Sequence, residues 1–175
     1  MKISSNVISV LGKTPRIGNN CFIAPTAMLI GDVILGDNCS VWFNAVIRGD
    51  VNYIKIGNNV NIQDGVIIHG TYKRAPVEIG NYVSIAHRAI IHGCTIKDKV
   101  LIGMGAIIMD HCIINGYTII AAGSVVLENT IVEEYSIYAG IPAKKIKSIT
   151  PELIEQEIER IANNYLLYSS WYKNA

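Results

Sequence analysis

Three histidines are the residues of this sequence best suited to chemistry at a metal ion: His69, His87 and His92. Three imidazoles that leave a fourth position open to water form a catalytic zinc site. Such a site lowers the pKa of the bound water to about 7 and so supplies hydroxide at neutral pH. We interpret the three histidines as ligands of one metal ion, for which zinc is suited, although cobalt or ferrous iron would also fit. The fourth histidine, His111, lies at a different repeat position and is expected at the surface.

A six-residue repeat fixes the directions in which these histidines point. Aliphatic residues recur every six positions, and a small or β-branched residue follows most of them four positions later. The aliphatic ladder comprises Ile17, Ile23, Leu29, Leu35, Val41, Ile47, Ile56, Ile62, Ile68, Ile79, Ile85, Ile91 and, from Ile96, every sixth residue to Val132. This period does not fit an amphipathic α-helix but is typical of a hexapeptide-repeat β-helix, in which three short strands form one triangular coil. The sequence therefore predicts an all-β solenoid, a parallel β-helix of about six to seven stacked coils, over residues 1–148.

The repeat stops near residue 148, and a helical pattern begins. Thr150 is suited to cap a helix, and Pro151 fits its first position. An apolar stripe with helical spacing follows at Ile154, Ile158, Ile161 and Tyr165. We expect residues 149–175 to form a C-terminal α-helix and tail, packed along the solenoid within the same structural domain. The aromatic tail residues Tyr168, Trp171 and Tyr172 are expected to form a contact surface, such as one with another subunit.

Counting hexapeptides assigns the histidines to faces of the coil. The three faces are numbered in order along the chain, with Ile17 on the first face. The third faces of successive coils receive Ile47, Ile68 and Ile91, provided that the insertions near residues 50–55 and 73–78 are corner loops. The residues that follow them, Arg48, His69 and His92, then form one column. His87 and Asp64 belong to the second face, so His87 can meet the other two histidines only across a subunit boundary. The sequence therefore predicts a rotationally closed oligomer, and a triangular prism favours a homotrimer.

The segments around the histidines resemble the γ-class carbonic anhydrase family, in particular its short bacterial branch. They are SVWFNAV at 40–46, RGD at 48–50, NIQDG at 61–65, His69, AHRAIIHG at 86–93, which contains His87 and His92, and LIGMGA at 101–106. The resemblance covers roughly residues 10–147 and implies a left-handed β-helix. It also implies that His69 and His92 bind zinc together with His87 of the neighbouring subunit. Zinc-bound hydroxide would then attack CO2 to give bicarbonate.

The same resemblance implies roles for further polar residues. Gln63 would hydrogen-bond the metal-bound hydroxide or bicarbonate, and its amide can both donate and accept. Arg48, Asp50 and Asp64 would form ion pairs across the trimer interface, where a guanidinium can bridge carboxylates. A local turn-stabilising pair of Arg48 and Asp50 is the alternative.

Two more candidates for the catalytic site are less specific. Asn61 either stacks within the turns or lines the cleft. Tyr138 lies in a segment that often closes such solenoids, so it either reaches toward the site or caps the prism. We include both residues in the expected site.

The sequence departs from the prototype of the family where a proton would leave the site. Val51 stands where the prototype has a glutamate, and the loop at 70–78 is short and mostly basic. Its one carboxylate, Glu78, adjoins the returning strand and is poorly placed as a proton shuttle. Without a shuttle, proton removal from the zinc-bound water could limit the rate severely. The sequence therefore indicates the metal site more strongly than rapid turnover.

Two other functions fit the same scaffold. One is an acyl-CoA-directed enzyme, either a hexapeptide acyltransferase or a zinc thioesterase. A single catalytic histidine suffices for an acyltransferase, so three histidines favour the hydratase. The other is a catalytically silent, metal-stabilised trimer.

Composition narrows the partners and the location. The net charge is +1, 17% of the residues are charged and no long basic cluster occurs, which argues against nucleic acid. The absence of a membrane-spanning apolar run or a signal peptide predicts a cytoplasmic protein that binds no membrane. Cys21 and Cys39, like Cys94 and Cys112, are one coil apart, and in a reducing cytosol we expect structural thiols rather than disulfides.

Overall fold

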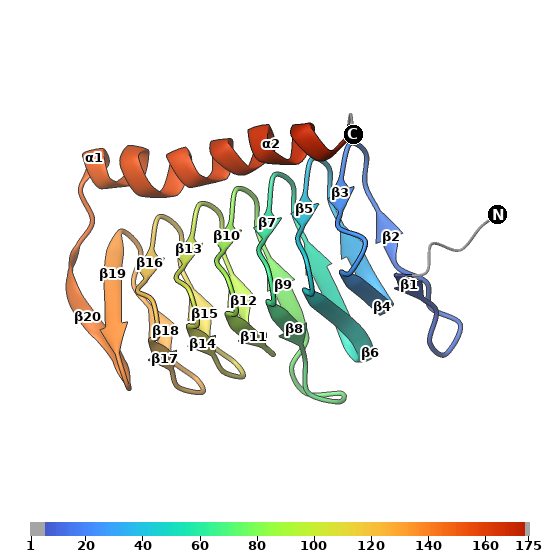
Figure 1. Ribbon diagram of the computed structural model, residues 1–175. Coiled ribbons are helices and arrows are strands. Elements are labelled where there is room, and N and C mark those ends of the chain that lie inside the picture. Colours follow the sequence, from blue (N-terminus) through green and yellow to red (C-terminus); the bar gives the residue numbers. More distant parts are fainter. Residues whose placement is uncertain (1–5, 174–175) are drawn as a thin grey trace.

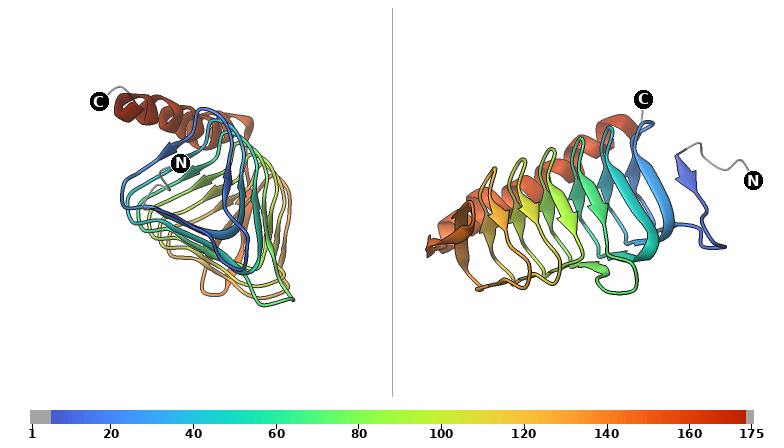
Figure 2. Two further views of the ribbon diagram at one scale, coloured as in Figure 1. Left: turned by 90° about the vertical axis from the view of Figure 1, so that its right-hand side faces the viewer. Right: turned by 90° about the horizontal axis from the view of Figure 1, so that it is seen from below.

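The computed structural model describes residues 6–173 and consists of a left-handed parallel β-solenoid with one C-terminal helical segment along its side (Figure 1). This confirms the hexapeptide β-helix. Seen along its axis, the solenoid is a triangular prism with the helix over one face (Figure 2). Within the described residues, no helix is long and apolar enough to cross a membrane.

Two sheets make up the three faces of the prism. The second face contains β3 (Phe22–Ile23), β5 (Ser40–Val41), β7 (Asn61–Ile62), β10 (Ser84–Ile85), β13 (Leu101–Ile102), β16 (Ile119–Ile120), β19 (Ser136–Gly140) and β20 (Ala143–Ser148). The third and first faces share a sheet that contains β1 (Val7–Ile8), β2 (Arg16–Ile17), β4 (Met28–Leu35), β6 (Val46–Ile56), β8 (Ile67–His69), β9 (Val77–Ile79), β11 (Ile90–His92), β12 (Thr95–Ile96), β14 (Ile107–Ile108), β15 (Ile113–Ile114), β17 (Val125–Val126) and β18 (Ile131–Val132). They share it because β4 and β6 continue around the corner between the two faces. The third face consists of β1, the first halves of β4 and β6, and β8, β11, β14 and β17.

The two insertions behave differently. The expectation of a corner loop at residues 50–55 is wrong, because β6 runs through this segment without interruption. The second insertion does form a turn, which the Thr71–Ala75 bridge closes. The first insertion shifts the register of β4 against β6, where Gly31 pairs with Gly49 and the next pair is Val33 with Ile54. Because this shift comes after Arg48, the column of Arg48, His69 and His92 is preserved.

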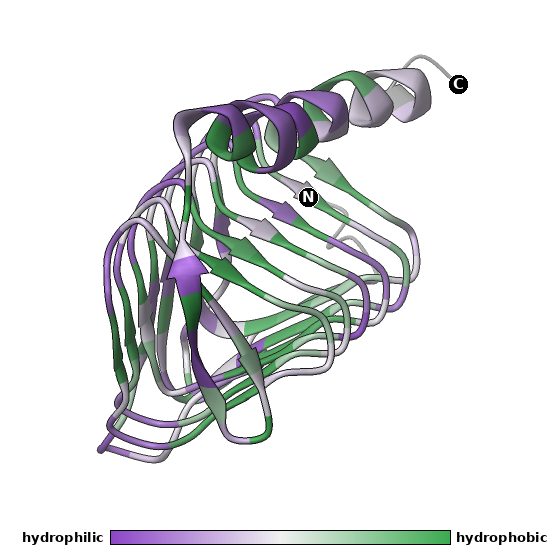
Figure 3. Cartoon of the chain, turned by 90° about the vertical axis from the view of Figure 1, so that its left-hand side faces the viewer, coloured by the Kyte–Doolittle hydropathy of each residue, from purple (hydrophilic) through white to green (hydrophobic). Residues whose placement is uncertain are grey.

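The core is the stacked aliphatic ladder. Ile62, Ile85 and Ile102 lie in register on the second face, and each is fully buried. In Figure 3, many strand segments are coloured as hydrophobic, and many corners between them are more hydrophilic. Burial of these branched side chains supplies the main favourable free energy of a solenoid, because each coil covers the next.

The C-terminal segment begins as predicted. The Thr150 hydroxyl accepts a hydrogen bond from the Leu153 backbone N–H at 3.4 Å and caps α1 (Pro151–Leu153). A π-helical stretch, η1 (Ile154–Glu159), leads into α2 (Arg160–Lys173). Ile158 is buried in a cluster with residues of β13, β19 and the segment before the helix. The predicted apolar stripe therefore does pack along the solenoid, and the segment runs back over the second face toward β3 (Figure 1).

Part of the aromatic tail packs within the chain. The ring centroid of Tyr172 lies 5.2 Å from that of Phe22 and 5.5 Å from that of Trp42. Trp171 remains 60% exposed. The tail thus fastens the last helical turns to the first coils, and Trp171 is left as its outward-facing ring.

The four cysteines are free thiols, as expected. Burial raises the pKa of the Cys94 thiol, and a hydrogen bond with Cys21 together with burial raises the pKa of Cys39. Both thiols are therefore protonated at neutral pH, which is consistent with structural roles.

Candidate metal centre

His69 and His92 lie side by side on the third face. Each is the last residue of its strand, and the parallel register of β8 and β11 pairs them directly. The preceding residues, Ile68 and Ile91, point into the core and are fully buried. Because successive side chains of a strand point to opposite faces, the two imidazoles project outward together.

Each imidazole of this pair is held by a carboxylate. His69 Nε2 lies 3.0 Å from Asp50 Oδ1, and His92 Nδ1 lies 2.5 Å from Asp110 Oδ1. An ionised carboxylate only accepts, so each ring donates its N–H there. The remaining nitrogens, His69 Nδ1 and His92 Nε2, face each other at 3.3 Å, and in neutral rings whose outer nitrogens carry the proton both have a lone pair available.

This spacing fits two ligands of one zinc ion. Two nitrogens at Zn–N distances of 2.0–2.1 Å on tetrahedral corners lie about 3.3–3.4 Å apart. Among residues 6–173, no group of three metal-binding side chains converges within the single chain. His69 and His92 are therefore two of the three expected ligands, and the third expected ligand, His87, does not join them within the single chain.

His87 lies on the other side of the corner. It follows β10, and Arg88 with its φ of 59° turns the chain directly after it. His87 Nδ1 pairs with Asp64 Oδ2 at 2.9 Å, while Nε2 lies 3.4 Å from the hydroxyl oxygen of Tyr165. His87 points away from the pair on the third face, which is the arrangement that the face count predicts.

Tyr165 is a neighbour of the site that the sequence pattern did not reveal. Burial, together with the Asp64 charge, raises the pKa of Tyr165 to about 12, so the phenol stays protonated and can donate to His87 Nε2. Its helical spacing indicated only an apolar stripe. The path of the helix over the second face is what brings it to His87.

Gln63 and Asn61 lie beneath the helix and next to Asp64. The Gln63 amide donates to Asn61 Oδ1 at 3.0 Å, and the Asn61 amide donates to Ser84 Oγ at 2.7 Å. Both side chains are nearly inaccessible, at 3% and 2% exposure. Asn61 therefore fixes the Gln63 side chain and does not itself line an open cleft.

The expected ion-pair residues form two separate pairs within the chain. Arg48 Nη1 lies 2.6 Å from Asp50 Oδ2, whereas Asp64 pairs with His87. Burial opposes ionisation of Asp50, but hydrogen bonds from Arg48 and His69 outweigh it and lower the pKa of Asp50. Arg48 thus keeps Asp50, whose carboxylate holds His69, in its ionised form.

Tyr138 does not reach these residues. It takes the inward ladder position of β19, in register with Ile120, and is buried in the core at 7% exposure. Its hydroxyl accepts a hydrogen bond from the Glu133 backbone N–H at 3.5 Å. Because the ring fills the last coils, the structure corrects its assignment to catalysis and supports the alternative, a capping aromatic.

Asp110 was also missed at the sequence level, although a signal was present. It follows β14 and lies 18 residues after His92, which is one coil of the repeat. The hydroxyl of Thr71 donates to its second oxygen. Burial opposes ionisation of Asp110, but the hydrogen bonds from Thr71 and His92 outweigh it and hold the pKa of Asp110 below its ordinary value. His111, the next residue, is exposed, as expected.

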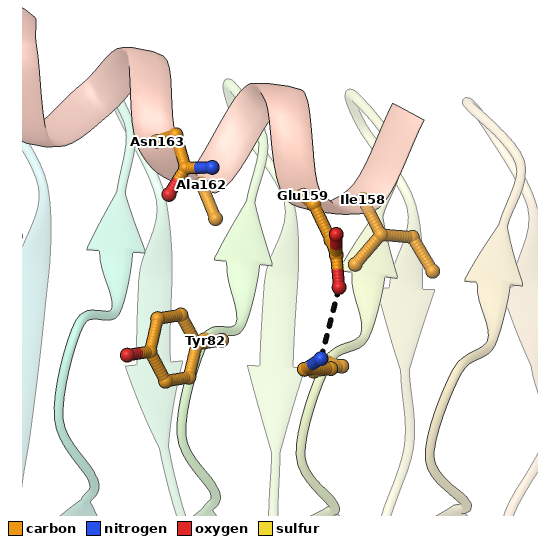
Figure 4. A pocket seen from close by; sticks show the side chains of 6 residues that line it. Tyr82, Ile158, Glu159, Ala162 and Asn163 are labelled. Atoms are coloured by element: carbon orange, nitrogen blue, oxygen red, sulfur yellow. Dashed lines mark hydrogen bonds and ion pairs between the residues drawn. The ribbon is translucent and has the colours of Figure 1, made fainter. Parts of the chain in front are cut away.

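Two hollows border the helix, and neither contains the histidine pair. One, of about 340 Å³, is lined by Tyr82, Lys99 and helix residues, and the Lys99–Glu159 ion pair of 2.9 Å crosses it (Figure 4). The other, of about 280 Å³, is lined by aromatic rings together with Asp64. The histidine pair therefore lies on the third face, outside both hollows.

Comparison with known proteins identifies relatives that match most of the chain. The family model "Bacterial transferase hexapeptide (six repeats)" matches residues 14–49 and 93–128. A protein named "Carbonic anhydrase" from Geobacillus kaustophilus (strain HTA426) is 40% identical over 162 residues, which are 93% of this chain and 88% of that protein. "Gamma carbonic anhydrase 2, mitochondrial" from Arabidopsis thaliana is 38% identical over 91% of this chain, which spans only 59% of its length. The crystal structure of a hexapeptide transferase family protein from Anaplasma phagocytophilum has a TM-score of 0.90 and 36% identity, with 95% of this chain and 97% of that one covered.

Proposed function

Because this chain belongs to the γ-class carbonic anhydrase family, we propose that it is a zinc-dependent carbonic anhydrase that converts CO2 to bicarbonate. The observation that carries the proposal is the imidazole pair of His69 and His92. Their facing nitrogens are 3.3 Å apart, and a carboxylate holds the opposite nitrogen of each ring. A purely structural pair of histidines has no need for two lone pairs directed at each other.

The proposed site is completed by His87 of a neighbouring subunit, in a homotrimer. Two observations support a second copy as the partner. The third face carries outward apolar side chains beside the histidines, including Ile67 at 38% and Ile90 at 37% exposure, and such a face is typical of an interface. His87 is part-exposed at the corner of the second face, so a neighbour related by rotation can bring it there.

The residues of the proposed site would have separate roles in the reaction. Zinc held by three imidazoles supplies a nucleophile at neutral pH, because it lowers the pKa of bound water to about 7; cobalt or ferrous iron would suit the same donors. Gln63, whose amide donates to Asn61, lies beside Asp64 on the second face, so it would orient the nucleophile from the subunit that supplies His87. Asp50, kept ionised by Arg48, holds His69. The outward isoleucines of the third face provide an apolar wall for CO2.

Removal of the proton from the metal-bound water is the step for which this chain provides the fewest candidate residues. Glu78, the one carboxylate of the 70–78 loop, lies in β9 on the first face, and its Oε1 accepts a hydrogen bond from the Tyr53 hydroxyl at 2.8 Å. It therefore points away from the histidines. We expect turnover to depend on an external proton acceptor and to rise with imidazole buffer concentration, until another step limits the rate.

The test combines metal content, subunit number and activity. We expect about one zinc per chain by elemental analysis, a trimer by light scattering, and CO2 hydration in stopped-flow measurements. His92→Ala should abolish hydration, whereas the control His111→Ala removes an exposed histidine and should not. A zinc-loaded trimer with no hydration above background, at any buffer concentration, would exclude the proposal.

Likeness to a hexapeptide transferase family protein supports a second candidate, an acyl-CoA-directed enzyme. The same zinc-loaded protein should then release CoA from acetyl-CoA, with or without an amine acceptor. CoA release without CO2 hydration would favour this candidate. Metal binding with neither activity would leave a metal-stabilised structural trimer.

A further inference from the structure

We propose that Asp110 is a positioning residue of the metal centre, which fixes the tautomer and the ring orientation of His92 so that Nε2 is directed at the metal. The inference rests on the proposed zinc site and adds a residue to it. Asp110 Oδ1 lies 2.5 Å from His92 Nδ1, the nitrogen on the far side of the ring from His69. A neutral imidazole carries one ring proton, and the carboxylate draws that proton to Nδ1.

Asp110 is itself held in place from a different part of the chain. Its Oδ2 accepts a hydrogen bond from the Thr71 hydroxyl, which belongs to the turn after β8. Both carboxylate oxygens are thus engaged, and the side chain is only 19% exposed. A carboxylate fixed at both oxygens restricts rotation of the His92 ring. A single hydrogen bond to a mobile side chain would not restrict it.

Gly93 makes the room that this contact requires. A Cβ at position 93 would lie 2.4 Å from Asp110 Oδ1 and 2.6 Å from the Ala75 Cβ. Only the absence of a side chain directly after His92 lets the carboxylate approach the ring. The glycine, the carboxylate and the threonine therefore form one local arrangement around a single nitrogen.

Asp50 has the equivalent position at His69, which shows what the arrangement achieves. Each imidazole donates a hydrogen bond to a carboxylate on the outer side, and the two inner nitrogens are left as electron-pair donors for a cation. Carboxylate partners of this kind typically contribute about 10–100-fold to metal affinity. We expect Asp110 to contribute within that range.

The test compares Asp110→Asn with the wild-type protein and with Asp98→Asn. Asp98 is a matched control, because it is also a coil-corner carboxylate, but it accepts from the Asn81 backbone N–H and touches no histidine. Thr71→Val is a second variant that leaves the carboxylate in place and removes its support. Zinc affinity is measured by competition with a chromophoric chelator, and the His92 tautomer by nitrogen NMR of the zinc-free protein.

The expected result is a 10–100-fold loss of zinc affinity in Asp110→Asn, a smaller loss in Thr71→Val and no change in Asp98→Asn. The zinc-free wild-type protein should show His92 protonated at Nδ1, and Asp110→Asn should show a mixture of tautomers. Unchanged affinity and tautomer in Asp110→Asn, with zinc still bound by the wild type, would overturn the inference and leave the proposed function intact. A wild-type protein that binds no zinc would overturn both.

Discussion

Replacing Gly93 by alanine tests whether the space beside His92 serves the metal centre. Gly93 has a φ of +52°, and its new Cβ would meet Asp110 and Ala75 at 2.4 and 2.6 Å. Gly105 offers a matched control: its φ is +66°, and a Cβ there would meet nothing within 4 Å. The two variants share the backbone cost and differ only in the contact.

The expected sizes follow from these contacts. A non-glycine residue in the left-handed region costs roughly 1–2 kcal/mol, and this applies to both variants. Overpacking against Ala75, whose backbone is tied into the Thr71 turn, adds about 1–3 kcal/mol in Gly93→Ala alone. The displaced carboxylate should also weaken zinc binding by about tenfold or more, whereas Gly105→Ala should bind zinc as the wild type does.

Denaturant unfolding of the zinc-free proteins measures the first difference, at one fixed subunit concentration because the assembly contributes to stability. Chelator competition measures the second. If Gly93→Ala loses no more stability and no more zinc affinity than Gly105→Ala, then Gly93 does not provide the space that Asp110 needs to reach His92. A loss of stability with unchanged zinc affinity would show that Asp110 reaches His92 by another route.

Three further predictions follow from other contacts. Tyr165→Phe should bind zinc up to about fivefold more tightly, because the hydrogen bond of about 1 kcal/mol to His87 Nε2 no longer has to be broken; weaker binding in chelator competition would contradict this. Lys99→Met should cost no more than about 1 kcal/mol at pH 7, since the Glu159 pair is partly exposed. Glu159 raises the pKa of Lys99, so this contribution is complete below the ordinary value of 10.5 and is lost as the pH rises through the raised value; an undiminished difference in unfolding at pH 12 would argue against the pair. Ile85→Ala should cost about 2–5 kcal/mol in denaturant unfolding, because the side chain is fully buried in the ladder, and a loss below 1 kcal/mol would contradict the ladder as the main source of stability.

The parts of the fold that follow a period could be predicted from the sequence. A repeat of six with one inward position per strand determines which residue of each strand faces outward, so the pairing of His69 with His92 could be expected. The same count placed His87 on another face, as the structure does. The continuous strand through residues 50–55 could not be anticipated, because an insertion has no period that distinguishes a loop from a strand.

The remaining errors have local physical causes. Tyr138 was taken for a site residue, yet it replaces an aliphatic residue on the inward ladder, where a large ring can fill the last coils. Tyr165 was read only as part of an apolar stripe, because helical spacing gives the face of a helix but not its path over the solenoid. Asp110 could have been found from its distance of one coil from His92, because that spacing places two residues side by side.

The helical segment connects the two ends of the solenoid, and this has a consequence for the order of events during synthesis. Coils couple mainly to their neighbours, so the first coils can assemble as soon as they leave the ribosome. At about 5–20 residues per second, Tyr172 is made roughly 7–26 s after Trp42, the ring that it covers. During that interval the aromatic second face of the first coils is uncovered and available to chaperones. Tyr165 reaches His87 in the same late stage, so the surroundings of this proposed ligand are completed only after the helical segment has been made.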